Sequence, residues 1–302
     1  MSDVRFDDKV VLVTGAGGGL GRSHALLFAK HGAKVVVNDL GGSLQGEGSG
    51  ETPAQKVVEE IEAAGGKAVA NYDSVSEQAG AEAMVKAAVD TFGRLDVVIN
   101  NAGILRDTSF KKMDHDAFDA VLNVHLKGSF NVTKAAWPLF LEQGYGRVIM
   151  TSSAAGLYGN FGQTNYAAAK AGLIGMGQTL AQEGAKYNIH TNIIAPFAKS
   201  RMTETILPPE VLEHLDPNLV SPLVAWLCSD ECTSNGQVYE VGAGLVTRLR
   251  WARTGPFAVV AKEGLTPEQV RDNWETIESM EGHTVCETIQ DSLGQFMKHI
   301  KA

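Results

Sequence analysis

The chain is poor in positive charge for its length. Its 302 residues contain 26 lysines and arginines against 35 aspartates and glutamates, a formal net charge of −9 with histidines neutral, and no lysine- or arginine-rich run. Proteins that bind a phosphate backbone need a basic surface. The charge balance therefore excludes a nucleic acid as a partner and argues against an acidic membrane surface.

Cysteines and long apolar runs are also scarce. Three cysteines in the whole chain favour free thiols in a reducing compartment. Cys228 and Cys232 have the spacing of a metal pair on one helix face, but no cluster of further ligands lies nearby and structural zinc takes about four, so no metal is expected. No window reaches the roughly 18 to 20 apolar residues of a membrane span, and residues 1–8 lack the apolar core of a signal peptide. We expect a soluble intracellular protein.

Short apolar strands alternate with amphipathic helices along the first 200 residues. The predicted strands are 9–13, 33–38, 68–72, 95–100, 147–152, 190–195 and, as the last edge strand, 237–241. The predicted helices are 20–30, 52–64, 77–92, 118–140 and 166–187. This alternation predicts an α/β fold: a doubly wound, Rossmann-type parallel sheet of about seven strands flanked by helices.

The pattern changes after the last predicted strand. A capping-box start at 266–269 predicts a helix to about Met280. We therefore expect one domain over residues 1–245 and a C-terminal helical extension, 246–302, packed on the same domain. Between 200 and 230 prolines interrupt a mostly helical stretch, and its first part, 200–217, is expected to be a mobile flap over an apolar cleft.

Glycine is abundant, with 33 residues, and its excess is concentrated in the first fifty positions. Residues 14–21, TGAGGGLG, follow a strand and open a helix, where glycines let the backbone approach a pyrophosphate closely. Asp39 ends the second strand, at the place where an acid hydrogen-bonds the ribose of a dinucleotide. Its carboxylate would repel a 2′-phosphate, which favours NAD over NADP. The alternative is a flexible turn with a solvated aspartate. The second glycine cluster, 41–50, has no role that the sequence reveals.

Tyr166 and Lys170 are four residues apart on a predicted helix, so their side chains share a face. An ammonium beside a phenol stabilises the phenolate, and we expect it to lower the tyrosine pKa toward neutrality and produce a general base. Ser153 follows the preceding strand and could hydrogen-bond a substrate oxygen. Taken alone, a Tyr-x-x-x-Lys pair is more often a solvated helix face.

Together these motifs resemble those of the short-chain dehydrogenase/reductase family over about residues 6–245. Residues 14–21 are similar to its cofactor loop, 100–103 (NNAG) to its sheet-stabilising motif, and Ser153, Tyr166 and Lys170 to its catalytic residues. The resemblance implies that an NAD-binding catalytic domain occupies 1–245. It also implies a homodimer through the helices that begin near Phe118 and Tyr166. The cofactor contacts it implies are Gly15, Gly19, Leu20, Gly21, Asp39, Asp73, Asn101, Ala102, Gly103, Tyr166 and Lys170.

One position departs from the family pattern. His125 stands where the family's proton relay usually has an asparagine, in the segment 123–128 (NVHLKG). It therefore becomes a fourth candidate catalytic residue. Either this histidine holds the relay water as asparagine would, or it satisfies a kinked helix.

Within the family, residues 37–42, 103–107, 158–163 and 200–203 are similar to the (3R)-hydroxyacyl-CoA dehydrogenase units of type 2 peroxisomal multifunctional enzymes. This likeness implies NAD-dependent oxidation of (3R)-3-hydroxyacyl-CoA to 3-oxoacyl-CoA in fatty-acid β-oxidation. An acyl-CoA is then the substrate, with Arg106 and Arg201 as candidates to meet its phosphates. A stand-alone homologue would be cytoplasmic and an excised domain peroxisomal. The alternatives are a hydroxysteroid dehydrogenase, a 3-oxoacyl-ACP reductase that uses NADPH, and a non-catalytic NAD-binding module.

Overall fold

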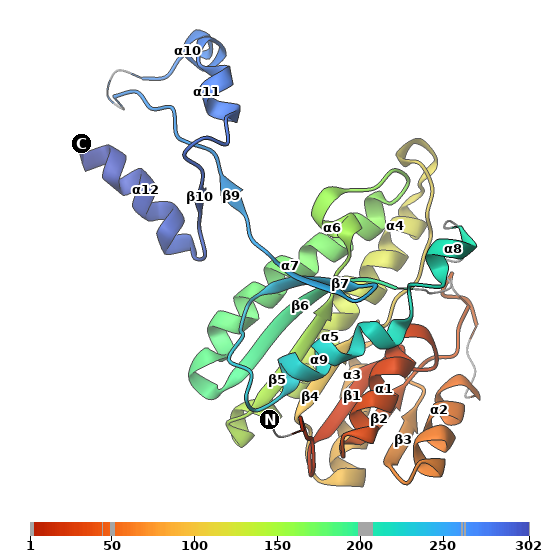
Figure 1. Cartoon of the computed structure of the whole chain (residues 1–302). Helices are drawn as coiled ribbons and strands as arrows, with labels where there is room; N and C mark the ends of the chain where they lie inside the picture. Colours follow the sequence, from red (N-terminus) through yellow and green to blue (C-terminus); the bar gives the residue numbers. More distant parts are fainter. Residues whose placement is uncertain are drawn as a thin grey trace. The chain divides into compact units, whose positions relative to one another are not determined.

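The chain forms a mostly parallel, eight-stranded sheet with helices on both faces (Figure 1). The computed structural model describes residues 3–43, 45–48, 52–198, 208–260, 262 and 264–301. The strand order is β3-β2-β1-β4-β5-β6-β7-β8. Neighbouring strands from β3 through β7 pair in parallel. The predicted doubly wound α/β fold is confirmed.

The strands match the predicted apolar runs within a few residues. They are β1 (Val10–Thr14), β2 (Lys34–Asn38), β3 (Lys67–Asn71), β4 (Val97–Asn100), β5 (Gly146–Thr151), β6 (Ile189–Phe197), β7 (Val238–Gly242) and β8 (Leu245–Leu249). The inner strands are valine- and isoleucine-rich because helices cover both faces of a parallel sheet. The prediction that 237–241 is the edge strand is wrong, since β8 continues the sheet. No residue of β8 is fully buried, so no apolar run marks it in the sequence.

Helices cover the two faces of the sheet in separate groups. One group contains α1 (Gly19–Lys30), α2 (Thr52–Ala63) and α9 (Ser221–Cys228); the other contains α3 (Gln78–Phe92), α5 (Gly128–Gln143) and α7 (Thr164–Gly184) (Figure 1). Shorter helices are α4 (His115–Leu122), α6 (Ala154–Tyr158) and α8 (Pro209–Leu212), with single 3-10 turns η1 (Phe110–Lys112), η3 (Ala185–Tyr187) and η4 (Pro217–Leu219). Of the predicted flap, 199–207 lie outside the described residues.

The predicted helix over 118–140 is continuous in the structure, but it is not α-helical throughout. A π-helical turn, η2 (Asn123–Lys127), separates α4 from α5. His125 lies in this turn, and its backbone oxygen accepts a hydrogen bond from Ser129 Oγ at 2.6 Å. A wide turn of this kind re-aims a side chain without ending the helix, and such turns are frequent at functional sites.

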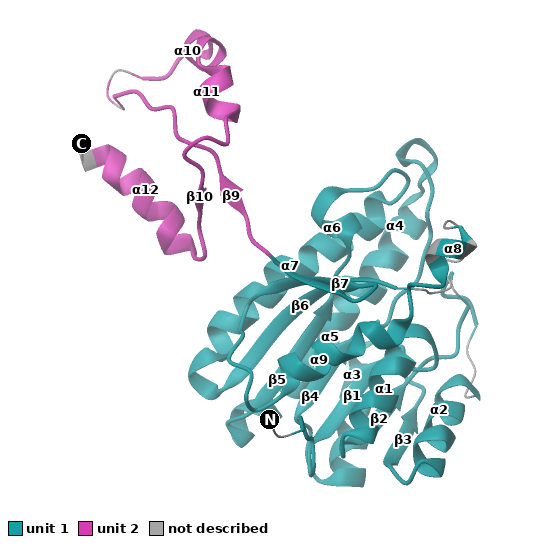
Figure 2. Ribbon diagram, in the orientation of Figure 1, with its two compact units in different colours: residues 1–248 teal, residues 249–302 magenta. Residues whose placement is uncertain are grey.

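The contacts divide the chain into two compact units, residues 1–248 and 249–302 (Figure 2). The second unit contains β9 (Ala252–Arg253), α10 (Pro267–Asp272), α11 (Trp274–Glu278), β10 (Thr284–Val285) and α12 (Ile289–Lys301). Strand β9 pairs antiparallel with β10. The predicted capping box between Thr266 and Gln269 is confirmed, but the predicted continuous helix to Met280 is interrupted at Asn273. The predicted packing of the extension on the first domain stays a prediction.

The strand order places a crevice at one end of the sheet. The order reverses between β1 and β4, and in open α/β sheets ligands bind outside the carboxyl ends of the strands at such a switch point. The glycine loop follows β1, the NNAG motif ends and follows β4, and Ser153 comes just after β5. The topology thus gathers the predicted motifs at one edge.

Candidate active site

The glycine loop is shaped to receive a ligand on its outer side. Gly19 has φ +52°, in the left-handed region that favours glycine. At Gly21 an added Cβ would lie 2.2 Å from the Gly15 carbonyl oxygen, so any side chain would force the loop off α1. At Gly18 and Gly19, by contrast, a Cβ would meet nothing within 4 Å. The loop is packed on its inner side and open on the other, which fits a pyrophosphate at a helix N-terminus.

Asp39 is held beside this loop by two backbone groups. Its Oδ2 accepts a hydrogen bond from Gly17 N at 2.8 Å, and its Oδ1 accepts one from Gly41 N at 2.7 Å. The carboxylate is therefore fixed at the end of β2, where the sequence predicts an acid that hydrogen-bonds the ribose of a dinucleotide. Asp73 lies after β3, where its Oδ2 accepts from Asn71 Nδ2 at 2.7 Å.

The NNAG motif joins the ends of β1 and β4. Asn101 Nδ2 donates to Thr14 O at 3.0 Å and to Gly15 O at 3.1 Å. Thr14 Oγ1 in turn accepts from the backbone nitrogens of Asn101 and Ala102. These residues buttress the glycine loop. Their direct contact with a cofactor, like that of Leu20 in the first turn of α1, stays a prediction.

Ser153, Tyr166 and Lys170 come together where β5 ends and α7 begins. Lys170 is 3% exposed, and its Nζ donates to Thr151 O at 2.5 Å and lies 5.5 Å from the centroid of the Tyr166 ring. The Ser153 hydroxyl caps α6 by accepting from Ala155 N at 3.2 Å. Ser152 Oγ instead donates to Lys170 O at 2.8 Å. Of these two serines, Ser153 is the one whose hydroxyl hydrogen-bonds with Tyr166.

The predicted lowering of the tyrosine pKa is wrong for the chain by itself. Burial raises the pKa of Tyr166 to about 12, opposed by its hydrogen bond with Ser153 and reinforced by the Asp107 carboxylate. Burial also lowers the pKa of Lys170 from 10.5 to about 7. Only the protonated form of Lys170 can stabilise a phenolate, so a working base at Tyr166 needs Lys170 to keep its proton.

His125 packs directly against the tyrosine. Its ring meets the Tyr166 ring edge-on with centroids 5.2 Å apart, and its Nε2 lies 3.0 Å from Ile104 N and 2.8 Å from Ile104 O. Burial and then the Lys170 charge lower its pKa to about 3, so the ring is neutral. Its Nδ1 is buried without a protein partner among the described residues. His125 lies in the π-helical turn, which agrees with the alternative that it satisfies an irregular helix. Its role in a proton relay stays a prediction.

Gly103 lets this histidine approach. A Cβ at Gly103 would lie 2.3 Å from His125 Cε1. The absence of a side chain at Gly103 therefore allows the loop after β4 to pack against the π-helical turn. The sequence assigned Gly103 to the cofactor, and the contact with His125 becomes visible only in the folded chain.

Sequence reasoning missed Asn165, which fixes the start of α7. This residue is fully buried; its Nδ2 donates to Arg106 O at 3.0 Å and to Ala117 O at 3.2 Å, and its Oδ1 accepts from Tyr166 N at 2.8 Å. The amide thereby ties the backbone of the catalytic candidate to the segment after β4. A polar residue four positions before the buried Ala169, on the apolar face of α7, was the available signal.

The second glycine cluster docks on the same segment. At Gly46 a Cβ would lie 3.0 Å from Ile104 Cδ1, and Arg106 Nε donates to Gln45 O at 3.1 Å. Residues 45–46 of this cluster therefore contact the segment that contains Ile104, whose backbone binds His125. Arg106, a candidate for the CoA phosphates, binds this loop, and Arg201 lies outside the described residues.

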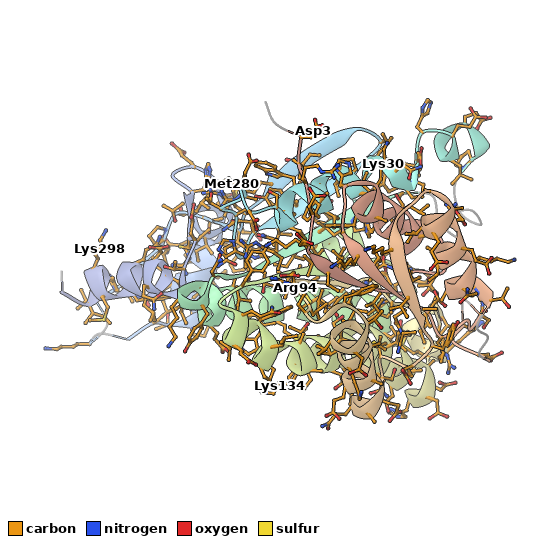
Figure 3. The ribbon with its side chains drawn as sticks, turned by 90° about the horizontal axis from the view of Figure 1, so that it is seen from below. Asp3, Lys30, Arg94, Lys134, Met280 and Lys298 are labelled. Atoms are coloured by element: carbon orange, nitrogen blue, oxygen red, sulfur yellow. The ribbon has the colours of Figure 1, made fainter. Side chains whose placement is uncertain are left out.

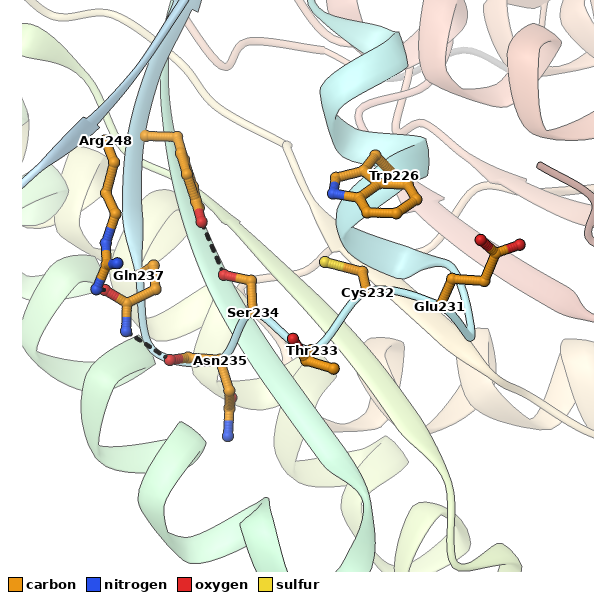
Figure 4. A pocket seen from close by; sticks show the side chains of 9 residues that line it. Trp226, Glu231, Cys232, Thr233, Ser234, Asn235, Gln237 and Arg248 are labelled. Atoms are coloured by element: carbon orange, nitrogen blue, oxygen red, sulfur yellow. Dashed lines mark hydrogen bonds between the residues drawn. The ribbon is translucent and has the colours of Figure 1, made fainter. Parts of the chain in front are cut away.

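Other chemistry-bearing features lie away from the crevice. Cys228 and Cys232 are free and buried in the core, and the described part of the chain contains no group of three metal-ligating side chains. None of its helices is long and apolar enough to cross a membrane. An open polar pocket (Figure 4) lies where 231–237 lead into β7, at the amino-terminal edge of the sheet. It is lined by Trp226, Glu231, Cys232, Thr233, Ser234, Asn235, Gln237, Tyr239 and Arg248.

Known proteins resemble the chain over most of its length. Residues 9–210 match the family model described as short chain dehydrogenase. The peroxisomal multifunctional enzyme type 2 of Mus musculus is 58% identical over 294 residues, 97% of this chain and 40% of that protein. A putative short-chain type dehydrogenase/reductase of Mycobacterium tuberculosis is 59% identical over 242 residues, 80% of this chain and 85% of that protein.

A solved structure gives the same result for the fold. Full-length peroxisomal multifunctional enzyme type 2 from Drosophila melanogaster has a TM-score of 0.83 at 41% identity, over 99% of this chain and 50% of that one. The chain therefore spans two fifths to one half of these two multifunctional relatives.

Proposed function

Because the chain belongs to the short-chain dehydrogenase family, we propose that it oxidises (3R)-3-hydroxyacyl-CoA to 3-oxoacyl-CoA with NAD, as a step of fatty-acid β-oxidation. The observation that carries the proposal is the convergence of Ser153, Tyr166 and Lys170 at the carboxyl end of β5, beside the crevice at β1 and β4. The names of the multifunctional relatives support the peroxisomal setting.

The chain's own residues suit this chemistry. A nicotinamide cofactor, which the Rossmann fold of the family implies, would supply the hydride acceptor when bound. Tyr166 takes the proton of the secondary alcohol at its phenolic oxygen while the carbon loses hydride, and Ser153 donates a hydrogen bond to the substrate oxygen. Burial raises the pKa of the Tyr166 phenol to about 12, and we expect a protonated Lys170 to lower it, because positive charge near a buried oxygen favours its anion.

The preference for NAD over NADP rests on Asp39. Its carboxylate stands at the end of β2, fixed by Gly17 N and Gly41 N, and a 2′-phosphate there would face a like charge. The residues after it, 40–42, contain no arginine or lysine that could hold such a phosphate.

Neutralising this carboxylate is expected to change the cofactor preference. In Asp39→Asn an oxygen remains to accept from Gly17 N, but the charge is gone. We expect the ratio of kcat/KM with NAD to that with NADP to fall about a hundredfold, because each charge-dependent contact contributes roughly 1.5 to 3 kcal/mol. Initial rates with both cofactors measure the ratio. An unchanged ratio would show that the carboxylate does not select the cofactor.

The substrate class is tested by absorbance of the reduced nicotinamide. The protein is assayed with NAD or NADP against (3R)-3-hydroxyacyl-CoA, its 3S enantiomer and a hydroxysteroid. We expect turnover with NAD and the 3R ester. Activity confined to the 3S ester or to the steroid, or to NADPH-dependent reduction of a 3-oxoacyl thioester, would contradict the proposal, and no turnover with any of them would favour an NAD-binding module.

Assembly and compartment are part of the same proposal. We propose a homodimer in which the helical stretch from Phe118 through α5 and the helix α7 form the interface, with residues 246–302 packed on the 1–245 domain. The compartment is the peroxisome where the chain is part of a multifunctional enzyme and the cytoplasm where it stands alone.

A further inference from the structure

Two loops at the mouth of the crevice carry aromatic side chains with little cover. Phe110 begins η1 and is 77% exposed, and Phe161, in the turn after α6, is 90% exposed. Figure 1 shows the chain before α4 and the chain after α6 at the same end of the sheet. Rings this exposed bury little area in the fold, and aromatic side chains are favoured at sites that bind a flat or partly apolar partner.

Hydrogen bonds fix these two loops to each other and to the catalytic helix. Thr108 N donates to Gly162 O at 2.9 Å, and Gln163 Nε2 donates to Asp107 Oδ2 at 2.6 Å. The second loop runs directly into α7, which carries Tyr166. The two loops that carry Phe110 and Phe161 are therefore hydrogen-bonded to each other and continuous with the helix that carries Tyr166.

Two unpaired cations follow the first ring. Lys111 and Lys112 complete η1 and are exposed, and within the described ranges neither forms an ion pair. The flanking carboxylates have hydrogen bonds of their own: Asp107 accepts from Gln163, and Asp114 accepts from Ala117 N at 2.7 Å. On a chain of net charge −9, η1 thus carries two exposed ammonium groups that are adjacent in the sequence, between the carboxylates of Asp107 and Asp114.

We propose that Phe110, Lys111, Lys112 and Phe161, the mouth patch, bind the nucleotide end of coenzyme A, with the adenine against the rings and the phosphates at the ammonium groups. The inference rests on the proposed function, since a thioester that reacts at Tyr166 must extend its nucleotide toward solvent. A polyanion meets repulsion from an acidic protein unless cations stand where it docks. Nucleobases stack on exposed aromatic side chains without needing a specific pattern of hydrogen bonds.

The test compares two thioesters that differ only in the nucleotide. The variant Lys111→Ala/Lys112→Ala is assayed with (3R)-3-hydroxyacyl-CoA and with the matching acyl-pantetheine. We expect KM for the CoA ester to rise about tenfold, equivalent to about 1.4 kcal/mol, with kcat unchanged and KM for the pantetheine ester unchanged. Phe110→Ala/Phe161→Ala is expected to act in the same direction.

A matched control removes the same charge from the other end of the sheet. Lys30, which Figure 3 labels, ends α1, and Lys67 begins β3; both are exposed. In Lys30→Ala/Lys67→Ala we expect KM for both thioesters to stay unchanged. An equal rise in KM for the CoA ester in this control would mean that net charge, rather than the mouth patch, governs the effect, and would overturn the inference.

Other outcomes also decide the question. Unchanged KM for the CoA ester, or an equal rise for both thioesters, in the mouth-patch variants would overturn the inference. So would a change of oligomeric state by sedimentation, which would make the patch an interface between copies. Calorimetric titration with adenosine 3′,5′-bisphosphate separates this inference from the proposed function: binding that the lysine variant loses supports the patch even without turnover, and no binding to the unmodified protein overturns it.

Discussion

Replacing Tyr166 by phenylalanine is expected to lower kcat about a thousandfold, because proton transfer by a positioned side chain contributes on the order of 10² to 10⁴ in rate. The substitution removes the hydroxyl that we propose takes the substrate proton. It keeps the ring that packs edge-on against His125, so the fold and the crevice are expected to remain. Steady-state rates with NAD and the 3R ester measure the effect, and fluorescence titration measures cofactor affinity, which should change little.

Tyr145→Phe is the matched control for this substitution. Tyr145 lies just before β5, at the amino-terminal edge of the sheet, where its hydroxyl is 3.4 Å from Cys228 O. Loss of the Tyr145 hydroxyl should leave kcat within about twofold of that of the unmodified protein, because this hydroxyl contacts no reacting group. If Tyr166→Phe retained a tenth of the turnover, the tyrosine would not be the base.

Ser153→Ala is expected to lower kcat about a hundredfold, the typical cost of removing one hydrogen-bond donor to a developing oxyanion. The neighbouring substitution gives the contrast. Ser152 Oγ is already used by Lys170 O, so Ser152→Ala should keep kcat within about threefold while lowering the free energy of unfolding by about 1 kcal/mol. Rates and chemical denaturation of both variants measure the two effects.

Loss of the cap on α6 is a second consequence of Ser153→Ala, because the same hydroxyl accepts from Ala155 N. Ser153→Thr keeps both the cap and the donor and should restore most of the turnover. Equal losses of kcat in Ser152→Ala and Ser153→Ala, or no recovery with threonine, would contradict the assignment of Ser153 as the donor.

Local features of the sequence were sufficient for the fold, and they singled out the candidate site residues Ser153, Tyr166 and Lys170 that the structure brings together. The glycine loop between β1 and α1 was predictable because its backbone excludes side chains, as at Gly21. The face shared by Tyr166 and Lys170 follows from helix geometry alone. The strands were visible because those buried on both faces read as continuous apolar runs. Strand β8 was missed because it is exposed and carries no such run.

Only the tertiary structure decided the electrostatics and the long-range contacts of the site. Burial raises the pKa of Tyr166 and lowers that of Lys170, and burial depends on segments far apart in the chain. The π-turn at His125 depends on the loop after β4, and the second glycine loop acquires a contact only where it meets Ile104. The sequence by itself determined which chemical groups are present and which side of each element they occupy. Folding determined which of them meet and how far water is excluded, because these depend on packing between residues that no local pattern connects.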